Sequence, residues 1–289
     1  MEDYSPEKEL LVGIDSDGCV FDTMELKHKE CFIPEFIHSY ELQGVSKYAR
    51  EAAEFVNLYS KSRGVNRFHA LVEQLDWLRR RPEVKQRGVK IAKPEGVINW
   101  MEQETKLGNP ALELAVEATG DHDLKKALQW SRSVNDRVAS MVHGVPPFPS
   151  VKNCLTRFAD SADMLVVSAT PSVALQAEWK EHGVARFVRE ICGQESGTKK
   201  EALAVAKHYA KDKSLMIGDA PGDRKAAVAN DSLFFPINPG NEEASWKRLL
   251  DEGMDRFFAG TFAGEYQQQL LSDFNQYLPA EPPWPVDAE

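Results

Sequence analysis

The sequence predicts an α/β protein in which a doubly wound parallel sheet is interrupted by an inserted all-α domain. Three observations support this prediction. Short, nearly continuous apolar runs recur along the chain, helix-like stretches alternate with the later runs, and one gap between runs is far too long for a simple strand–helix–strand unit. Unbroken apolar runs are typical of parallel strands covered on both faces.

The apolar runs predict the strands of the sheet. They lie at 10–14, 164–167, 214–217 and 232–235, with a further short candidate at 187–191. Between the later runs, residues 172–182 and 200–210 carry helix-forming sequence. This alternation predicts a Rossmann-like core in which helices cover both faces of the sheet.

The gap after the first strand predicts the inserted domain. About 150 residues separate Asp17 from Ser168, whereas a strand–helix–strand unit needs about 30. Inside the gap, apolar residues recur at spacings of three and four, as at Phe68, Leu71 and Leu75, which indicates amphipathic helices. We therefore expect an α/β core made of 1–23 and 145–289, and a helical cap domain over 24–144.

Prolines mark two further segments. Residues 145–149 read VPPFP, which stops a helix and predicts a hinge back into the core. Residues 279–289 contain four prolines, and we expect them to form a loosely packed tail.

The composition excludes several classes of protein. The formal net charge of -10 argues against a general nucleic-acid binder and against a membrane-surface binder, because both partners are polyanions. The acidic N-terminus lacks a signal-peptide pattern and no apolar run approaches a membrane span, so we expect a cytoplasmic protein. Four scattered cysteines fit reduced thiols. The oligomeric state is not predicted.

Two carboxylates follow the first strand directly. Asp15 and Asp17 stand two residues apart, and Gly18 lets the backbone turn at the strand end where open α/β sheets bind ligands. A calcium loop also begins with this pattern, but Cys19 and Leu26 occupy two of its ligand positions. An ordinary acidic turn remains the alternative for this segment alone.

A second acidic turn follows the third apolar run, at Asp219 and Asp223. Carboxyl ends of parallel strands share one edge of the sheet, so the two acidic turns are expected to meet. Magnesium prefers hard oxygen ligands. The sequence therefore predicts a Mg²⁺ site made by Asp15, Asp17, Asp219 and Asp223, although Asp219 alone would also fit a surface turn.

A hydroxyl and a lysine complete the constellation. Ser168 ends the second strand and could donate to a phosphate oxygen, and Lys199 precedes a helix and could hold a phosphate as a point charge. Each residue alone is a weak signal, and Lys200 is the alternative lysine. The order of acidic pair, hydroxyl, lysine and acidic pair is what favours a phosphoryl-transfer site.

This order resembles the four signature motifs of the haloacid dehalogenase-like superfamily, over residues 10–235 outside the insert. The resemblance implies a nucleophile at Asp15, a general acid/base at Asp17, a phosphate-binding hydroxyl at Ser168, the motif lysine at Lys199, and metal-side acids at Asp219 and Asp223. The insert resembles the cap placed between the first two motifs. Ser16 departs from the usual apolar residue, and the lysine lacks its frequent following proline.

The resemblance implies an Mg²⁺-dependent phosphatase that acts on a small phosphorylated metabolite through an aspartyl-phosphate. The resemblance also excludes three branches of the superfamily that lack a carboxylate at the position of Asp17. These are the enzymes that cleave carbon–halogen bonds, the ion-pumping ATPases and the enzymes that cleave phosphonates. A phosphosugar mutase remains the nearest alternative. A non-catalytic phospho-acceptor or a degenerate binding module is the alternative from another class. The basic segment 63–69, which includes Arg67, is a candidate for substrate selection, although a solvated helix entry also explains it.

Overall fold

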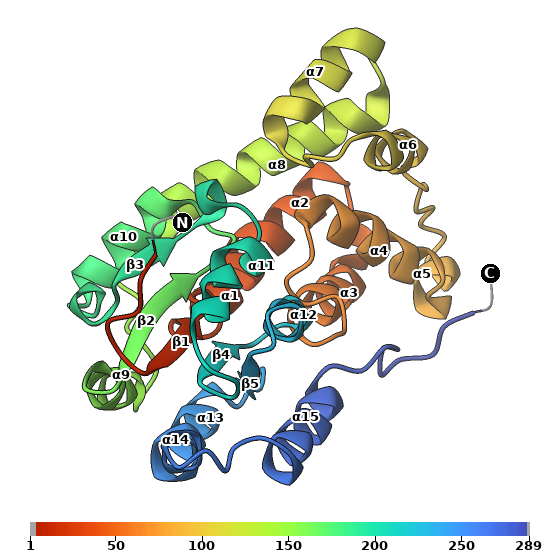
Figure 1. Cartoon of the computed structure of the whole chain (residues 1–289). Helices are drawn as coiled ribbons and strands as arrows, with labels where there is room; N and C mark the ends of the chain where they lie inside the picture. The colour runs from red at the N-terminus through yellow and green to blue at the C-terminus, as the bar shows by residue number, and fades with distance from the viewer. Residues whose placement is uncertain (1–3, 288–289) are drawn as a thin grey trace. The chain divides into compact units, whose positions relative to one another are not determined.

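The computed structural model describes residues 4–287, which form two compact units (Figure 1). The α/β unit contains residues 4–24 and 143–278, and the helical unit contains residues 25–142 and 279–287. Within 4–287, no helix is both long and apolar enough to cross a membrane.

A single five-stranded sheet forms the centre of the α/β unit (Figure 1). All its pairings are parallel, and the strand order is β3-β2-β1-β4-β5. The strands are β1 (Leu10–Ile14), β2 (Ala162–Val167), β3 (Glu190–Cys192), β4 (Ser214–Gly218) and β5 (Leu233–Pro236). The sheet confirms the predicted fold class, because the apolar runs are buried strands.

The register brings the carboxyl ends of the central strands together. Ile14 of β1 pairs with Val166 of β2 on one side and with Ile217 of β4 on the other. The loops that follow these three strands therefore start side by side, which is the position expected for a ligand site in such a sheet.

Helices cover both faces of this sheet. On one face, Val12 and Ile14 belong to a buried cluster with residues of α9, α10, α13 and α14, while Leu11 belongs to a second cluster with residues of α11, α12 and α15. The bounds are α1 (Thr23–Leu26), α9 (Val151–Ala159), α10 (Ser172–Glu181), α11 (Lys199–Ala202), α12 (Pro221–Ala229), α13 (Glu242–Arg248), α14 (Met254–Phe258) and α15 (Glu265–Tyr277).

The helix expected over 200–210 is shorter than predicted. After α11 the chain continues as a 3₁₀-helix over Leu203–His208. A 3₁₀-helix has three residues per turn, so Leu203 and Ala206 lie on one side of it. Both are buried in the cluster that contains Leu11. Packing of this short apolar stripe takes precedence over the α-helical propensity of the segment.

The helical unit folds around its own core. Its helices are α2 (Ile33–Ser39), α3 (Ser46–Leu58), α4 (Arg67–Arg79), α5 (Pro82–Gln86), α6 (Glu95–Gln103), α7 (Asn109–Thr119) and α8 (His122–Met141). A π-helical segment, Lys27–Phe32, precedes α2. The predicted amphipathic stripe is buried, since Phe68, Leu71 and Leu75 each expose 2% or less.

Residues 279–287 do not form the loosely packed tail that their prolines suggested. The Trp284 ring packs edge-on against Phe55 at 5.6 Å, and the Asp287 amide donates to the Arg80 carbonyl at 2.9 Å. The large aromatic side chain supplies apolar area that the proline pattern does not reveal. The segment belongs to the helical unit rather than to the core in which we expected it.

Candidate active site

Asp15 is the first residue after β1, and the end of the strand holds it in place. Its amide donates to the Ile217 carbonyl at 3.0 Å, and its own Oδ1 accepts from the Ser16 amide at 2.8 Å. The chain then turns at Gly18, whose φ of +74° suits glycine. Asp15 is 4% exposed. Its carboxylate is therefore fixed and nearly dry.

Lys199 reaches this carboxylate from the start of α11. Thr198 caps that helix, because its Oγ1 accepts from the Glu201 amide while Glu201 Oε2 accepts from the Thr198 amide. Lys199 Nζ lies 2.7 Å from Asp15 Oδ2 and 2.6 Å from Asp223 Oδ1. Of the two lysines considered for this role, Lys199 is the one that lies among the carboxylates.

Asp223 approaches the end of β4 because Gly218 has no side chain. A Cβ at Gly218 would lie 2.4 Å from the Asp223 Cβ, a distance that real Cβ atoms do not tolerate. Asp223 Oδ2 accepts from the Ala220 amide at 3.0 Å, which leaves Oδ1 for Lys199. Asp223 is completely buried and Asp219 is 1% exposed.

Three carboxylates form one buried group: Asp15, Asp219 and Asp223 each offer an oxygen within 4.8 Å of the others. Burial raises the pKa of both Asp15 and Asp223, against the opposing effect of Lys199. Burial also opposes the charged form of Lys199, but the surrounding carboxylates outweigh it and raise its pKa. With all groups ionised, three negative charges face one positive charge.

This donor set fits a hard divalent cation. Carboxylate oxygens at this spacing, without a thiolate or imidazole in the group, are the ligands that Mg²⁺ accepts. A divalent cation would also neutralise the charge that Lys199 leaves uncompensated. Asp15, Asp219 and Asp223 are therefore the residues that could hold it.

Asp17 lies outside this group, although we predicted its carboxylate as a fourth metal ligand. Its Oδ1 accepts from Thr23 Oγ1 at 2.5 Å and its Oδ2 accepts from Thr170 Oγ1 at 2.6 Å. The two hydroxyls contact both oxygens of the Asp17 carboxylate, and its roles in proton transfer and in metal binding stay predictions. The sequence analysis assigned no role to Thr23, six residues after Asp17, or to Thr170, two residues after Ser168.

Ser168 follows β2 and is 5% exposed. Its Oγ accepts from the Thr170 amide at 3.2 Å, so the turn that carries Ser168 also carries the hydroxyl bound to Asp17. The register places Ser168 beside the start of the Asp15 loop. It retains a hydroxyl hydrogen that could be donated to a phosphoryl oxygen.

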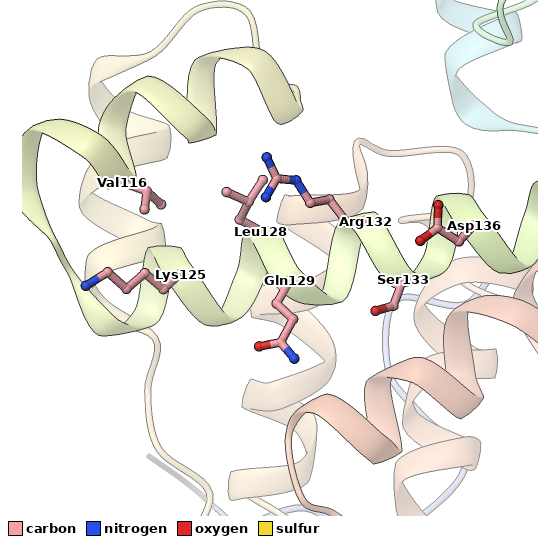
Figure 2. Close-up of a pocket in the computed structure, with 7 residues that line it drawn as sticks. All are labelled: Val116, Lys125, Leu128, Gln129, Arg132, Ser133 and Asp136. Atoms are coloured by element: carbon pink, nitrogen blue, oxygen red, sulfur yellow. The ribbon is translucent and has the colours of Figure 1, made fainter.

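Two open hollows lie away from these residues. One, of about 310 Å³, lies between α7 and α8 and is lined by Val116, Lys125 and Arg132 among others (Figure 2). The other, of about 270 Å³, follows β5 and includes Asn238 and Asn241. Neither hollow is lined by an acidic residue of the carboxylate group, so neither identifies a substrate.

Arg67, the candidate for substrate selection, is engaged within the helical unit. Its Nη1 donates to Ser131 Oγ at 2.9 Å and to Asn135 Oδ1 at 2.7 Å, and its guanidinium lies 5.1 Å from the centre of the Phe32 ring. Burial lowers its pKa. These contacts give Arg67 a structural role in joining α4 to α8.

Comparisons with known proteins identify no close relative. No protein-family model and no curated protein matches the chain. Among solved structures, the chain is similar to a predicted phosphoglycolate phosphatase from Lactobacillus delbrueckii subsp. bulgaricus, with 14% identity and a TM-score of 0.47 over 84% of this chain and 92% of the other. The chain is also similar to a haloacid dehalogenase-like family hydrolase from Streptococcus pneumoniae, with 15% identity and a TM-score of 0.42 over 84% of this chain and 91% of the other.

A predicted phosphoglycolate phosphatase from Haemophilus somnus gives 17% identity and a TM-score of 0.39, over 80% of this chain and 86% of the other. Likenesses this distant do not carry an activity or a substrate over to this chain. The function is therefore argued from the site itself.

Proposed function

We propose that this chain is an Mg²⁺-dependent phosphohydrolase that transfers the phosphoryl group of a small phosphorylated metabolite first to Asp15 and then to water. The observation that carries the proposal is the position of Lys199, whose Nζ lies 2.7 Å from Asp15 Oδ2 and 2.6 Å from Asp223 Oδ1. A nucleophilic carboxylate and a cation for phosphoryl oxygens are thus held together in one buried group.

The metal has a defined place in this proposal. Asp15, Asp219 and Asp223 would hold Mg²⁺, which would offset negative charge on the phosphoryl oxygens. The identity of the metal is inferred from the hard oxygen donors and from the uncompensated charge of the group.

The remaining residues divide the chemistry of the reaction. Asp15 attacks phosphorus, and its Oδ forms the new bond while the leaving oxygen departs. Asp17 protonates that oxygen and later takes a proton from the water that hydrolyses the aspartyl-phosphate. Lys199 and Ser168 offer donors to the phosphoryl oxygens, because phosphoryl transfer depends mostly on positioning and on charge stabilisation.

Asp17 is prepared for proton transfer by its two hydroxyl partners. With Thr23 and Thr170 donating to both of its oxygens, the carboxylate is oriented in the resting state. To act as an acid it must gain a proton and give up one of these bonds. A substrate whose leaving oxygen is to receive this proton would therefore have to displace one of the two threonine hydroxyls from Asp17.

A substrate screen tests the proposal. We expect release of phosphate from p-nitrophenyl phosphate, and from at least one member of a panel of sugar phosphates, nucleotides and phospho-acids, when Mg²⁺ is present. Chelation by EDTA should abolish turnover, and added Mg²⁺ should restore it. Full turnover in EDTA would overturn the metal assignment, and no turnover on any substrate with Mg²⁺ would overturn the phosphohydrolase.

A further inference from the structure

Ser16, the residue between Asp15 and Asp17, is completely buried and uses its hydroxyl twice. Trp179 Nε1 of α10 donates to Ser16 Oγ at 2.9 Å, and Ser16 Oγ donates to Glu178 Oε2 at 3.3 Å. Both Ser16 and Trp179 are 0% exposed. The apolar residue that the motif usually carries could make neither bond.

The backbone of Ser16 organises the same loop. Its carbonyl accepts from the amides of Cys19, Val20 and Phe21 at 3.2, 2.9 and 3.2 Å. Its amide donates to the carboxylate of Asp15. A displacement of Ser16 would therefore move the turn and loosen the carboxylate at once.

The tryptophan is itself tightly fixed. The Phe21 ring packs edge-on against Trp179, with centroids 6.0 Å apart and planes at 83°. A second indole, that of Trp246 in α13, donates to the Cys19 carbonyl at 2.7 Å. Two rigid side chains from separate helices thus hold the buried side of the loop.

We propose that Ser16 is a positioning residue whose hydrogen bond with Trp179 fixes the backbone between Asp15 and Asp17 for phosphoryl transfer. This inference rests on the proposed function and adds to it a residue that does not touch the reacting atoms. The reason is geometric: the turn itself belongs to no strand or helix, so side-chain contacts fix its position, and a misplacement of about 1 Å at a reacting group can cost about a hundredfold in rate.

Trp179→Phe removes only the bond with Ser16, whereas Ser16→Ala removes that bond and the longer one to Glu178, and each variant leaves most of the volume in place. We expect each variant to lower kcat about tenfold while KM changes less than about twofold, because part of the misplacement penalty is recovered by relaxation. The double variant should lose no more than Ser16→Ala alone, since Trp179→Phe removes no bond of Ser16 that Ser16→Ala retains. Trp130→Phe is the control, because its buried indole N–H has no partner within residues 4–287.

Two readouts separate this inference from the proposed function. In Ser16→Ala and Trp179→Phe, amide exchange at Cys19, Val20 and Phe21 should accelerate, and Mg²⁺ alone should raise the thermal midpoint less than in wild type. Both effects should appear even if no phosphatase substrate is found. Wild-type exchange and wild-type Mg²⁺ response in both variants would overturn the inference. A lower thermal midpoint with unchanged kcat, measured well below unfolding, would also overturn it.

Discussion

Lys199 in the α/β unit and Arg81 in the helical unit both expose little of their side chains, 20% and 5%, but they differ in what surrounds them. Lys199 in the α/β unit faces Asp15 and Asp223, whose side chains are 6% and 0% exposed. Arg81 in the helical unit pairs with Glu51 at 2.5 Å and with Glu83 at 3.3 Å, and these side chains are 36% and 37% exposed.

The remaining neighbours increase the contrast. The Arg81 guanidinium lies 4.5 Å from the centres of both the Tyr48 and the Trp284 rings. The Arg81 charge therefore contacts two aromatic faces and two carboxylates that are partly exposed to water. Such contacts stabilise a fold. Lys199 is instead outnumbered by buried carboxylates, and this excess of negative charge destabilises the fold unless a further cation binds to them. Unbalanced buried charge, rather than buried charge as such, therefore marks the candidate active site.

Asp17→Asn should have the largest effect among the variants that keep Asp15, because it removes the proton donor and acceptor. We expect kcat to fall about 10²- to 10⁴-fold for an alkyl phosphate, whose poor leaving group needs a proton. The rate of phosphoryl transfer to Asp15 should fall less for p-nitrophenyl phosphate, because its good leaving group needs no proton. Stopped-flow release of p-nitrophenol measures it, and near-normal turnover of the alkyl phosphate would refute the role of Asp17.

Replacing each cation by methionine tests the comparison itself. Lys199→Met should lower kcat by about 10²- to 10³-fold, the usual effect of losing one group that stabilises charge in the transition state. Arg81→Met should leave kcat within about twofold but lower the free energy of unfolding by about 2 kcal/mol, given two aromatic contacts and half-screened ion pairs. Urea unfolding and steady-state kinetics on both proteins measure this. A lowered kcat in Arg81→Met would contradict the distinction between a structural role for Arg81 and a catalytic role for Lys199.

The charge imbalance also predicts how stability depends on pH. Burial raises the pKa of Asp15 and Asp223 above the ordinary carboxyl value of 3.8, so the folded state holds their protons more tightly than the unfolded chain. Their contribution to the stability of the Mg²⁺-free protein is present below that value and is lost as the pH rises through the raised values.

Mg²⁺ should therefore raise the thermal midpoint more at pH 8 than at pH 5, where protons compete with the metal. Differential scanning calorimetry with and without Mg²⁺ measures the shift. Asp219→Asn provides the control, because it should reduce the shift at pH 8. Equal shifts at both pH values would contradict the charge balance assigned to the group.

Arg67→Ala should have the smallest effect on turnover. The basic segment 63–69 makes Arg67 a candidate for substrate selection, but its hydrogen bonds to Ser131 and Asn135 contribute to the packing of the helical unit. The variant should lower the free energy of unfolding by about 1 kcal/mol, the usual value of such hydrogen bonds, and leave KM and kcat unchanged. A raised KM for a preferred substrate that spares p-nitrophenyl phosphate would restore the original interpretation.

The α/β unit could be predicted from the sequence because its signals are local. Each central strand is a continuous apolar run, and Asp15, Ser168 and Asp219 follow such runs directly, so parallel pairing brings them to one edge. The resemblance to known motifs then ordered the candidates. It also favoured Lys199 over Lys200, and in the structure Lys199 is the lysine that contacts Asp15 and Asp223.

The contacts that the sequence did not predict join residues far apart in the chain. The partner of Ser16 is 163 positions away, and Asp17 and Thr170 are 153 positions apart. Trp284 reaches α3 across most of the chain length. Helical periodicity predicted which faces are buried in the helical unit, but it does not specify which helices pack together. The contacts of Arg67 with Ser131 and Asn135 of α8 therefore could not be predicted.

Trapping the phosphoryl group on the protein tests the central claim most directly. Asp17→Asn retains the nucleophile but lacks the base that activates water, so with p-nitrophenyl phosphate and Mg²⁺ it should accumulate a covalent phosphoenzyme. Intact-protein mass spectrometry after acid quench should show the added mass of one phosphoryl group, and peptide mapping should place it on Asp15. The double variant Asp15→Asn, Asp17→Asn should show none. A phosphoryl group on any other residue, or turnover that persists in Asp15→Asn, would contradict the account.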